Sequence, residues 1–254
     1  MQFPKKHFIK MILITLLTAL YISPALAGDP TNMADAMKDA GFKFETAHWI
    51  SDTTMDDGSG KIKKSTNKYW ISGRQSRIEM MDKDSGETQI IIDDGKQQFF
   101  YNPKQKAAMV MNSMVKSMYS GLMSSESFKQ AAENRKNAKT VGSETINGKP
   151  CTIKEYQNTI SNIVSQVREW VWDGKEFPMK SVVTIPGQTM NMMGQSIKMP
   201  GSKTESVVTE VTLDQPVDPS LFKLPAGVTL QTMGETMTPP PMENPEDEEP
   251  AEEE

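Results

Sequence analysis

The residue types that could support catalysis are scarce in this sequence and stand apart from one another. His48 is the one histidine beyond residue 27, so a zinc site or a catalytic triad that needs histidine would have to use it alone. His48 lies between Ala47 and Trp49 in an expected strand, which favours a structural histidine. Cys151 follows Pro150 in another expected strand with no base beside it, which favours a buried, inert thiol over a nucleophile. We therefore predict no catalytic residue and no enzyme activity.

A cluster of carboxylates could in principle form a calcium site, but its pattern is incomplete. Asp82, Asp84 and Glu87 resemble part of a calcium-binding loop, but a third acidic ligand and the glycine at the sixth position are missing. A solvated hairpin turn explains these residues better, and Asp93 with Asp94 is interpreted in the same way. No metal ligand and no cofactor is predicted from these groups.

Methionine is the remaining donor type, and 18 of the 20 methionines lie beyond Met1 and Met11. They concentrate in residues 109–123 and 190–199, and thioethers suit both adaptable apolar surfaces and Cu(I). For Met190, Met192 and Met193, in an expected loop over 186–202, copper binding stays open as an alternative. The first cluster recurs at helical spacing, which predicts a helix with one apolar face that acts as a lid: Met111, Met114, Val115, Met118 and Leu122.

The beginning of the chain has the order of a secretory signal. Lys5, Lys6 and Lys10 precede the apolar run 11–21, and Ala25-Leu26-Ala27 supplies a small-residue cleavage site. The run is short for a bilayer span of about 20 residues. We expect residues 1–27 to be a signal peptide removed before Gly28, and the mature protein to be soluble in the periplasm, with no integral membrane segment left.

The other end, residues 239–254, holds eight acidic residues and no basic one. Such a composition predicts a disordered acidic tail. Removing three signal lysines from 28 basic residues, and eight tail acids from 33 acidic ones, leaves 25 of each in residues 28–238. This neutral balance indicates no nucleic-acid partner.

Residues 28–238 are expected to form one mainly β domain. Runs rich in β-branched and aromatic residues, separated by turn dipeptides such as Asn147-Gly148 and Asp173-Gly174, predict eleven strands. Their tight spacing predicts antiparallel pairing. Helices are expected over 31–41, 111–122 and about 125–136, and the sheet is expected to curve around them. The predicted strands lie near residues 44–54, 61–72, 74–82, 87–93, 96–101, 106–111, 139–146, 149–158, 165–173, 177–185 and 203–213.

Large apolar residues recur at every second position in several of these strands, so the members of each set share a face of their strand. Taken singly they are ordinary core residues, and taken together they predict the wall of an apolar ligand cavity. The sequence does not say which face of the sheet is concave. The predicted cavity residues are Trp70, Ile78, Met80, Ile90, Ile92, Phe99, Tyr101, Trp170 and Trp172.

The block from Tyr69 to Tyr101, with Trp70, Arg74 and the run IIIDDGKQQFFYNP, resembles the LolA-like superfamily of periplasmic lipoprotein carriers. The elements GSETINGKP, VREWVWDGKEFPMKSVVTI and DPSLFKLPAGV are similar to the wider superfamily, which includes lipoprotein-sorting homologues and sigma-factor regulatory sensors. The resemblance implies an open antiparallel half-barrel of about eleven strands that is closed by helices and holds acyl chains. It also implies that Arg74 is the latch that holds the helical lid shut.

These observations predict a periplasmic carrier or chaperone whose cargo is an acylated lipid or lipoprotein. Two alternatives remain open: an envelope stress sensor, in which a lipid-binding domain signals to an envelope protein partner, and a methionine-rich copper-binding protein.

Overall fold

The computed structural model of the protein describes residues 42–110, 133–160, 163–192 and 195–232. Within these residues, strands dominate and helix is confined to residues 133–136 and to the short 3-10 helix η1 (Pro219–Phe222). The strands are β1 (Thr46–Asp56), β2 (Ile62–Ser72), β3 (Gln75–Asp82), β4 (Thr88–Asp93), β5 (Gln98–Asn102), β6 (Ala107–Val110), β7 (Lys139–Ile146), β8 (Lys149–Ile160), β9 (Ile163–Trp172), β10 (Phe177–Ile185), β11 (Gln188–Met192), β12 (Gln195–Met199), β13 (Ser202–Leu213) and β14 (Thr229–Thr232).

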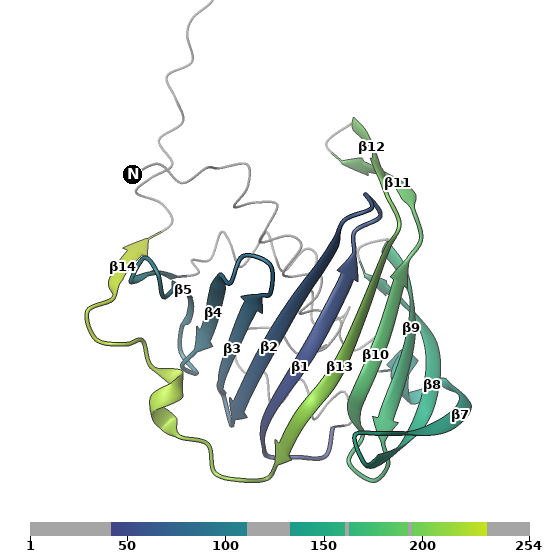
Figure 1. Ribbon diagram of the computed structural model, residues 1–254, viewed down its shortest axis with the longest axis horizontal. Helices are drawn as coiled ribbons and strands as arrows, with labels where there is room; N and C mark the ends of the chain where they lie inside the picture. The colour runs from purple at the N-terminus through teal and green to yellow at the C-terminus, as the bar shows by residue number, and fades with distance from the viewer. Residues whose placement is uncertain (1–41, 111–132, 161–162, 193–194, 233–254) are drawn as a thin grey trace, which may run out of the picture.

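Twelve of these strands form one open sheet in the order β14-β6-β5-β4-β3-β2-β1-β13-β10-β9-β8-β7. Figure 1 shows that β9, β8 and β7 turn back from the plane of β2, β1 and β13, so the sheet is curved and its two end strands do not meet. The prediction of a mainly β, open and curved sheet is therefore confirmed. The predicted helical lid over 111–122 and the expected helix over 31–41 lie outside the described residues.

Each of the eleven predicted strand ranges overlaps one observed strand, with ends that differ by up to two residues, but three strands were not predicted. Two of them, β11 and β12, form a separate antiparallel hairpin in the region 186–202 that was expected to be a loop. The third, β14, pairs with β6 in the parallel direction, so the prediction of a wholly antiparallel sheet was wrong. β6 and β14 lie far apart along the chain, so no tight hairpin between them sets the direction in which they pair.

The predicted turn dipeptide between β7 and β8 has the backbone conformation that a tight hairpin turn needs. Asn147 and Gly148, between β7 and β8, both have positive φ angles, of 46° and 74°. A two-residue hairpin turn needs this conformation at both central positions, and asparagine followed by glycine adopts it at low cost. The Asp82 carboxylate accepts hydrogen bonds from the backbone amides of Asp84 and Ser85, at 2.9 and 2.7 Å. The interpretation of this acidic group as a hairpin turn is therefore confirmed.

The pairing register assigns each side chain to one of two faces, because antiparallel partners lie on the same side of a sheet. The inner face carries Trp49, Tyr69, Ile78, Ile91 and Ser181, with the residues in register beside them. The outer face carries the alternate positions, among them His48, Trp70, Arg77, Ile92 and Lys180.

Candidate functional site

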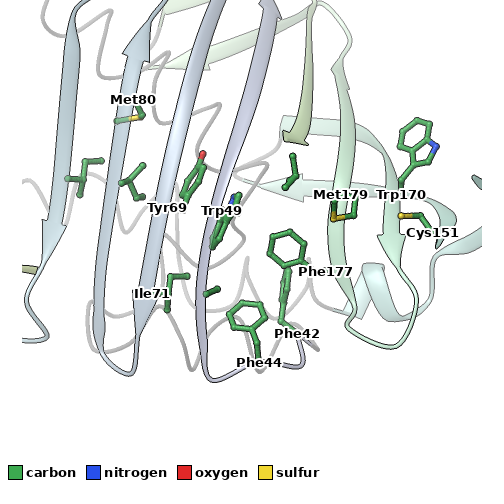
Figure 2. Close-up of a cluster of buried hydrophobic side chains, with 14 residues drawn as sticks. Phe42, Phe44, Trp49, Tyr69, Ile71, Met80, Cys151, Trp170, Phe177 and Met179 are labelled. Carbon is green, nitrogen blue, oxygen red and sulfur yellow. The ribbon is translucent and has the colours of Figure 1, made fainter. Parts of the chain in front are cut away.

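The inner face carries a cluster of five aromatic side chains, which we call the aromatic floor: Phe42, Phe44, Trp49, Tyr69 and Phe177. The Trp49 ring stacks on Tyr69 with ring centroids 4.4 Å apart and an interplanar angle of 9°. Phe177 meets Trp49 edge-on at 5.4 Å (Figure 2). Phe42 and Phe44, just before β1, contact the Phe177 ring at 6.4 and 6.1 Å. Since aromatic pairs add about 0.5–1.5 kcal/mol beyond area burial, this cluster is a firm apolar surface.

The polar atoms in and next to the aromatic floor are buried. Burial raises the pKa of Tyr69 well above its ordinary value, so the phenol stays neutral. The Ser51 hydroxyl acts on that pKa in the opposite direction, although Ser51 Oγ makes no hydrogen bond of normal geometry. Among the described residues, Trp49 Nε1 and Ser51 Oγ are buried side-chain atoms with no hydrogen-bond partner.

An aliphatic surface continues from the aromatic floor across β3 and β4. Tyr69 pairs with Ile78, Ile78 pairs with Ile91, and Ile91 pairs with Phe100. Ile78, Ile91 and Met80 belong to the same buried cluster as Trp49, and Phe100 packs against it. The inner face is thus apolar over at least five adjacent strands, from β5 to β1.

A buried ion pair lies beside the aromatic floor. Arg135, from the helical residues 133–136, donates from Nε to the Glu169 carboxylate at 2.9 Å, and both side chains are 5% exposed. Arg135 Nη2 donates to the Glu176 carbonyl oxygen at 2.6 Å, and the guanidinium lies 4.5 Å from the centre of the Phe42 ring. Burial and the nearby Glu169 carboxylate raise the pKa of Tyr156. These contacts attach residues 133–136 to the inner face.

The outer face of β3, β4 and β5 is covered by residues 214–228, which we call the C-terminal strap. Phe222 of η1 is completely buried, and Arg77 Nη1 donates to the Leu221 carbonyl oxygen at 3.0 Å. Leu224 packs against a buried cluster that includes Ile92. Four of the predicted cavity residues lie on this covered outer face: Ile90, Ile92, Phe99 and Tyr101.

The three predicted cavity tryptophans also lie on the outer face. Trp70 stacks on His48, with ring centroids 4.9 Å apart and an interplanar angle of 15°. Trp170 has the Lys180 ammonium group 4.9 Å from its ring centre, and Trp172 likewise has a lysine over its ring. Each ring already has a partner within the chain.

The nine predicted cavity residues therefore do not share one face: Ile78 and Met80 are on the inner face and the other seven are on the outer face. The prediction had taken the even-numbered positions of β4, but this strand is apolar at Ile90, Ile91 and Ile92. Where consecutive positions are apolar, the period of two does not choose a face.

Sequence reasoning missed Trp49, Tyr69 and Phe177, and it missed the pairing of Arg135 with Glu169. The shared parity of Ala47, Trp49 and Met55 in β1 was a usable signal for the inner face. No local sequence signal relates Arg135 to Glu169, because 34 positions separate them.

The predicted latch residue, Arg74, lies exposed in the turn between β2 and β3. Gly95 is close to it, since a Cβ at position 95 would come within 3.3 Å of the Arg74 Cβ. The lid residues Met111, Met114, Val115, Met118 and Leu122 lie outside the described residues, so the lid and its latch stay predictions.

The two isolated reactive residues, Cys151 and His48, lie in strands β8 and β1. Burial raises the pKa of the Cys151 thiol, which disfavours the nucleophilic thiolate. Burial lowers the pKa of His48, whose ring is stacked on Trp70. In the part of the chain that the structure describes, no group of three or more His, Cys, Asp or Glu residues is arranged to hold a metal ion. The described residues also include no helix with the length and apolar character needed to span a membrane.

Comparison with family models found no match, and comparison with curated protein sequences found none either. Solved structures do resemble this chain. A LolA superfamily protein from Nitrosomonas europaea is 11% identical with a TM-score of 0.35, and the match covers 74% of this chain and 96% of that one. A structure described as an outer membrane lipoprotein-sorting protein domain, from Vibrio parahaemolyticus, is 12% identical with a TM-score of 0.34, covering 75% and 95% of the two chains.

A further similar structure is the MucA/MucB complex of Pseudomonas aeruginosa, 13% identical with a TM-score of 0.40. That match covers 74% of this chain and 59% of the other. Two of these structures are described as a LolA superfamily protein and a lipoprotein-sorting domain, the group that the sequence resembles. At such identities the likeness concerns the fold, and no function follows from it.

Proposed function

We propose that the protein is a periplasmic carrier or chaperone that holds the acyl chains of a lipid or lipoprotein against the inner face of its sheet. The observation that carries the proposal is the apolar inner face of an open sheet, formed by the aromatic floor together with Ile78 and Ile91. Moving one methylene from water to such a surface gives about 0.8 kcal/mol. An acyl chain therefore binds there without specific polar chemistry.

In this proposal the helix that begins near Met111 is the lid over the inner face, and Arg74 is its latch. The signal over residues 1–27 directs the chain to the periplasm, where an acylated lipid or lipoprotein is the cargo and no cofactor takes part. Of the predicted cavity residues, Ile78 and Met80 are the ones that would contact the acyl chain.

Two neighbouring methionines in β3 provide a matched test. Met80 is on the inner face and 9% exposed, whereas Met81 is on the outer face and 42% exposed. Lysine at position 80 would place a charge against hydrocarbon, which is costly unless the charge stays hydrated. Met80→Lys should weaken the binding of a fluorescent fatty-acyl probe by about 10-fold or more, a change of about 1.4 kcal/mol, and Met81→Lys should leave it unchanged.

Denaturation curves of both variants would establish that the proteins compared are folded. A photoreactive diazirine fatty acid supplies a second readout, since it should label inner-face residues such as Phe100 and spare its outer-face neighbour Phe99. Absence of probe binding by the wild-type protein would refute the proposal, and so would equal affinities of the two lysine variants.

Native mass spectrometry of protein purified from the periplasm tests cargo and export together. Bound lipid on a chain that begins at Gly28 is the expected result. Bound Cu(I) without lipid would favour the copper-binding alternative instead, and a co-purified envelope protein without lipid would favour the stress sensor.

A further inference from the structure

A row of polar residues crosses the inner face beside the aromatic floor. The register places Ser65 opposite Thr53, Thr53 opposite Ser206, and Ser206 opposite Ser181. It continues with Ser181 opposite Glu169 and Glu169 opposite Lys154. The row spans six adjacent strands, from β2 to β8, and we call it the polar stripe: Ser65, Thr53, Ser206, Ser181, Glu169 and Lys154.

The polar stripe does not mark the end of the apolar surface, because apolar residues flank it on both sides. On the side of the aromatic floor lie Val208 and Met179, at the inner-face positions next to Ser206 and Ser181. On the opposite side the next inner-face positions include Met55, Val183 and Val167. All five flanking side chains are buried. The other inner-face neighbours of the stripe include the buried polar residues Ser51, Asn67 and Thr204, so the inner face is a largely apolar wall with a polar band across it.

Most of the stripe is buried, which is costly for polar groups without partners. Thr53, Ser206, Ser181 and Glu169 are 3–6% exposed. Thr53 Oγ1 and Ser206 Oγ share a hydrogen bond of 2.9 Å, and Asn67 Nδ2 donates to Thr53 Oγ1 at 2.9 Å. A hydroxyl offers one donor and two acceptor positions, so these bonds leave capacity for another group.

The charges at the end of the stripe neutralise one another. Glu169 is paired with Arg135 at 2.9 Å, and Lys154 Nζ lies 3.1 Å from the Glu176 carboxylate. The central part of the stripe consists of neutral hydroxyl groups. It therefore matches a group that accepts hydrogen bonds, or both donates and accepts them, without carrying a charge.

We infer that the polar stripe binds the uncharged linkage of an amphiphile, an ester, amide or hydroxyl group, while the acyl chain lies on the apolar surface beside it. This inference rests on the proposed carrier function and narrows its ligand class to acyl compounds with a neutral polar group next to the chain. A ligand that reaches the stripe exchanges hydrogen bonds with Thr53 and Ser206.

The test compares two pyrene-labelled probes of equal chain length, one a monoacylglycerol and the other an alkane. The mature full-length chain would carry Thr53→Val together with Ser206→Ala, which removes both hydroxyls at little change in shape. Replacing both partners of a buried hydrogen bond by apolar groups is close to neutral for stability, but Thr53→Val also leaves the buried Asn67 Nδ2 without its acceptor, at a cost of about 1–3 kcal/mol. Urea denaturation would therefore establish that the double variant is folded before its affinities are compared. The double variant should bind the monoacylglycerol about 3- to 10-fold more weakly, the equivalent of one net hydrogen bond, and bind the alkane as the wild type does.

Thr54→Val is the matched control, because Thr54 is exposed on the outer face next to Thr53, and it should change neither affinity. Ser181→Ala is the second variant if the double variant does not fold. It should also weaken the binding of the monoacylglycerol and leave the binding of the alkane unchanged. Equal effects on both probes, or none on either, would overturn the assigned role of the stripe and leave the carrier function standing. A wild-type protein that binds neither probe would overturn the carrier function itself.

Discussion

Replacing Arg135 by methionine should destabilise the protein far more than removing a surface arginine. Arg135 and Glu169 form an ion pair in which both side chains are 5% exposed. Arg135→Met leaves the Glu169 carboxylate buried without its cation, and breaking a buried pair in this way costs about 3–5 kcal/mol. The variant also loses the hydrogen bond to the Glu176 carbonyl and the contact with the Phe42 ring. For a domain of this size, the loss corresponds to a fall in Tm of about 10 °C.

The adjacent residue in β9 supplies the control. Arg168 is paired with Glu155 on the outer face, where the two side chains are 53% and 36% exposed. Exposed ion pairs contribute about 0–1 kcal/mol, so Arg168→Met should cost less than about 1 kcal/mol. A double variant with Arg135→Met and Glu169→Leu should recover most of the lost stability, since it leaves no buried charge behind.

Equilibrium urea denaturation at pH 7, followed by tryptophan fluorescence, measures the free energies of unfolding of the mature wild-type chain and of the three variants. If Arg135→Met cost no more than Arg168→Met, or if the double variant were less stable than Arg135→Met, the buried-charge explanation would be refuted.

Three further results are expected. Burial lowers the pKa of His48 below 6.5, so as the pH falls the unfolded chain takes up the proton before the folded chain does. The stability that the neutral ring contributes is therefore complete above about pH 6.5 and is lost as the pH falls below it. His48→Gln should make the urea-denaturation midpoint depend less on pH between about pH 7 and 5. Gly58→Ala should lower the free energy of unfolding by about 2 kcal/mol more than Gly60→Ala, as measured by thermal melts. Both glycines have positive φ, which strains alanine by about 1–2 kcal/mol, but only at position 58 would the Cβ come 1.9 Å from the Gly201 carbonyl oxygen. Equal costs would contradict this. Deleting residues 239–254 should change the unfolding free energy by less than about 0.5 kcal/mol, and a Tm several degrees lower would mean that the tail packs on the domain.

The amino-acid sequence by itself determined where the strands of this protein lie. Hairpin turns are local, and dipeptides such as Asn147-Gly148 carry the backbone conformation that a two-residue turn needs. Between those turns, alternation of apolar residues and β-branched composition were sufficient to locate eleven strands. The prediction that the chain has no catalytic residue also came from residue types alone, because His48 and Cys151 stand apart in the sequence.

Only the tertiary structure decided which side of each strand faces inward. Alternation defines two sets of positions, and in β4 both sets contain isoleucine. Ile91 packs on the inner face, whereas Ile92 lies on the outer face that the C-terminal strap covers. The parallel pairing of β14 and the polar stripe also depend on which distant segments meet. Thr53 and Ser206 hydrogen-bond across 153 positions, a contact set by the register between strands and not by any local pattern.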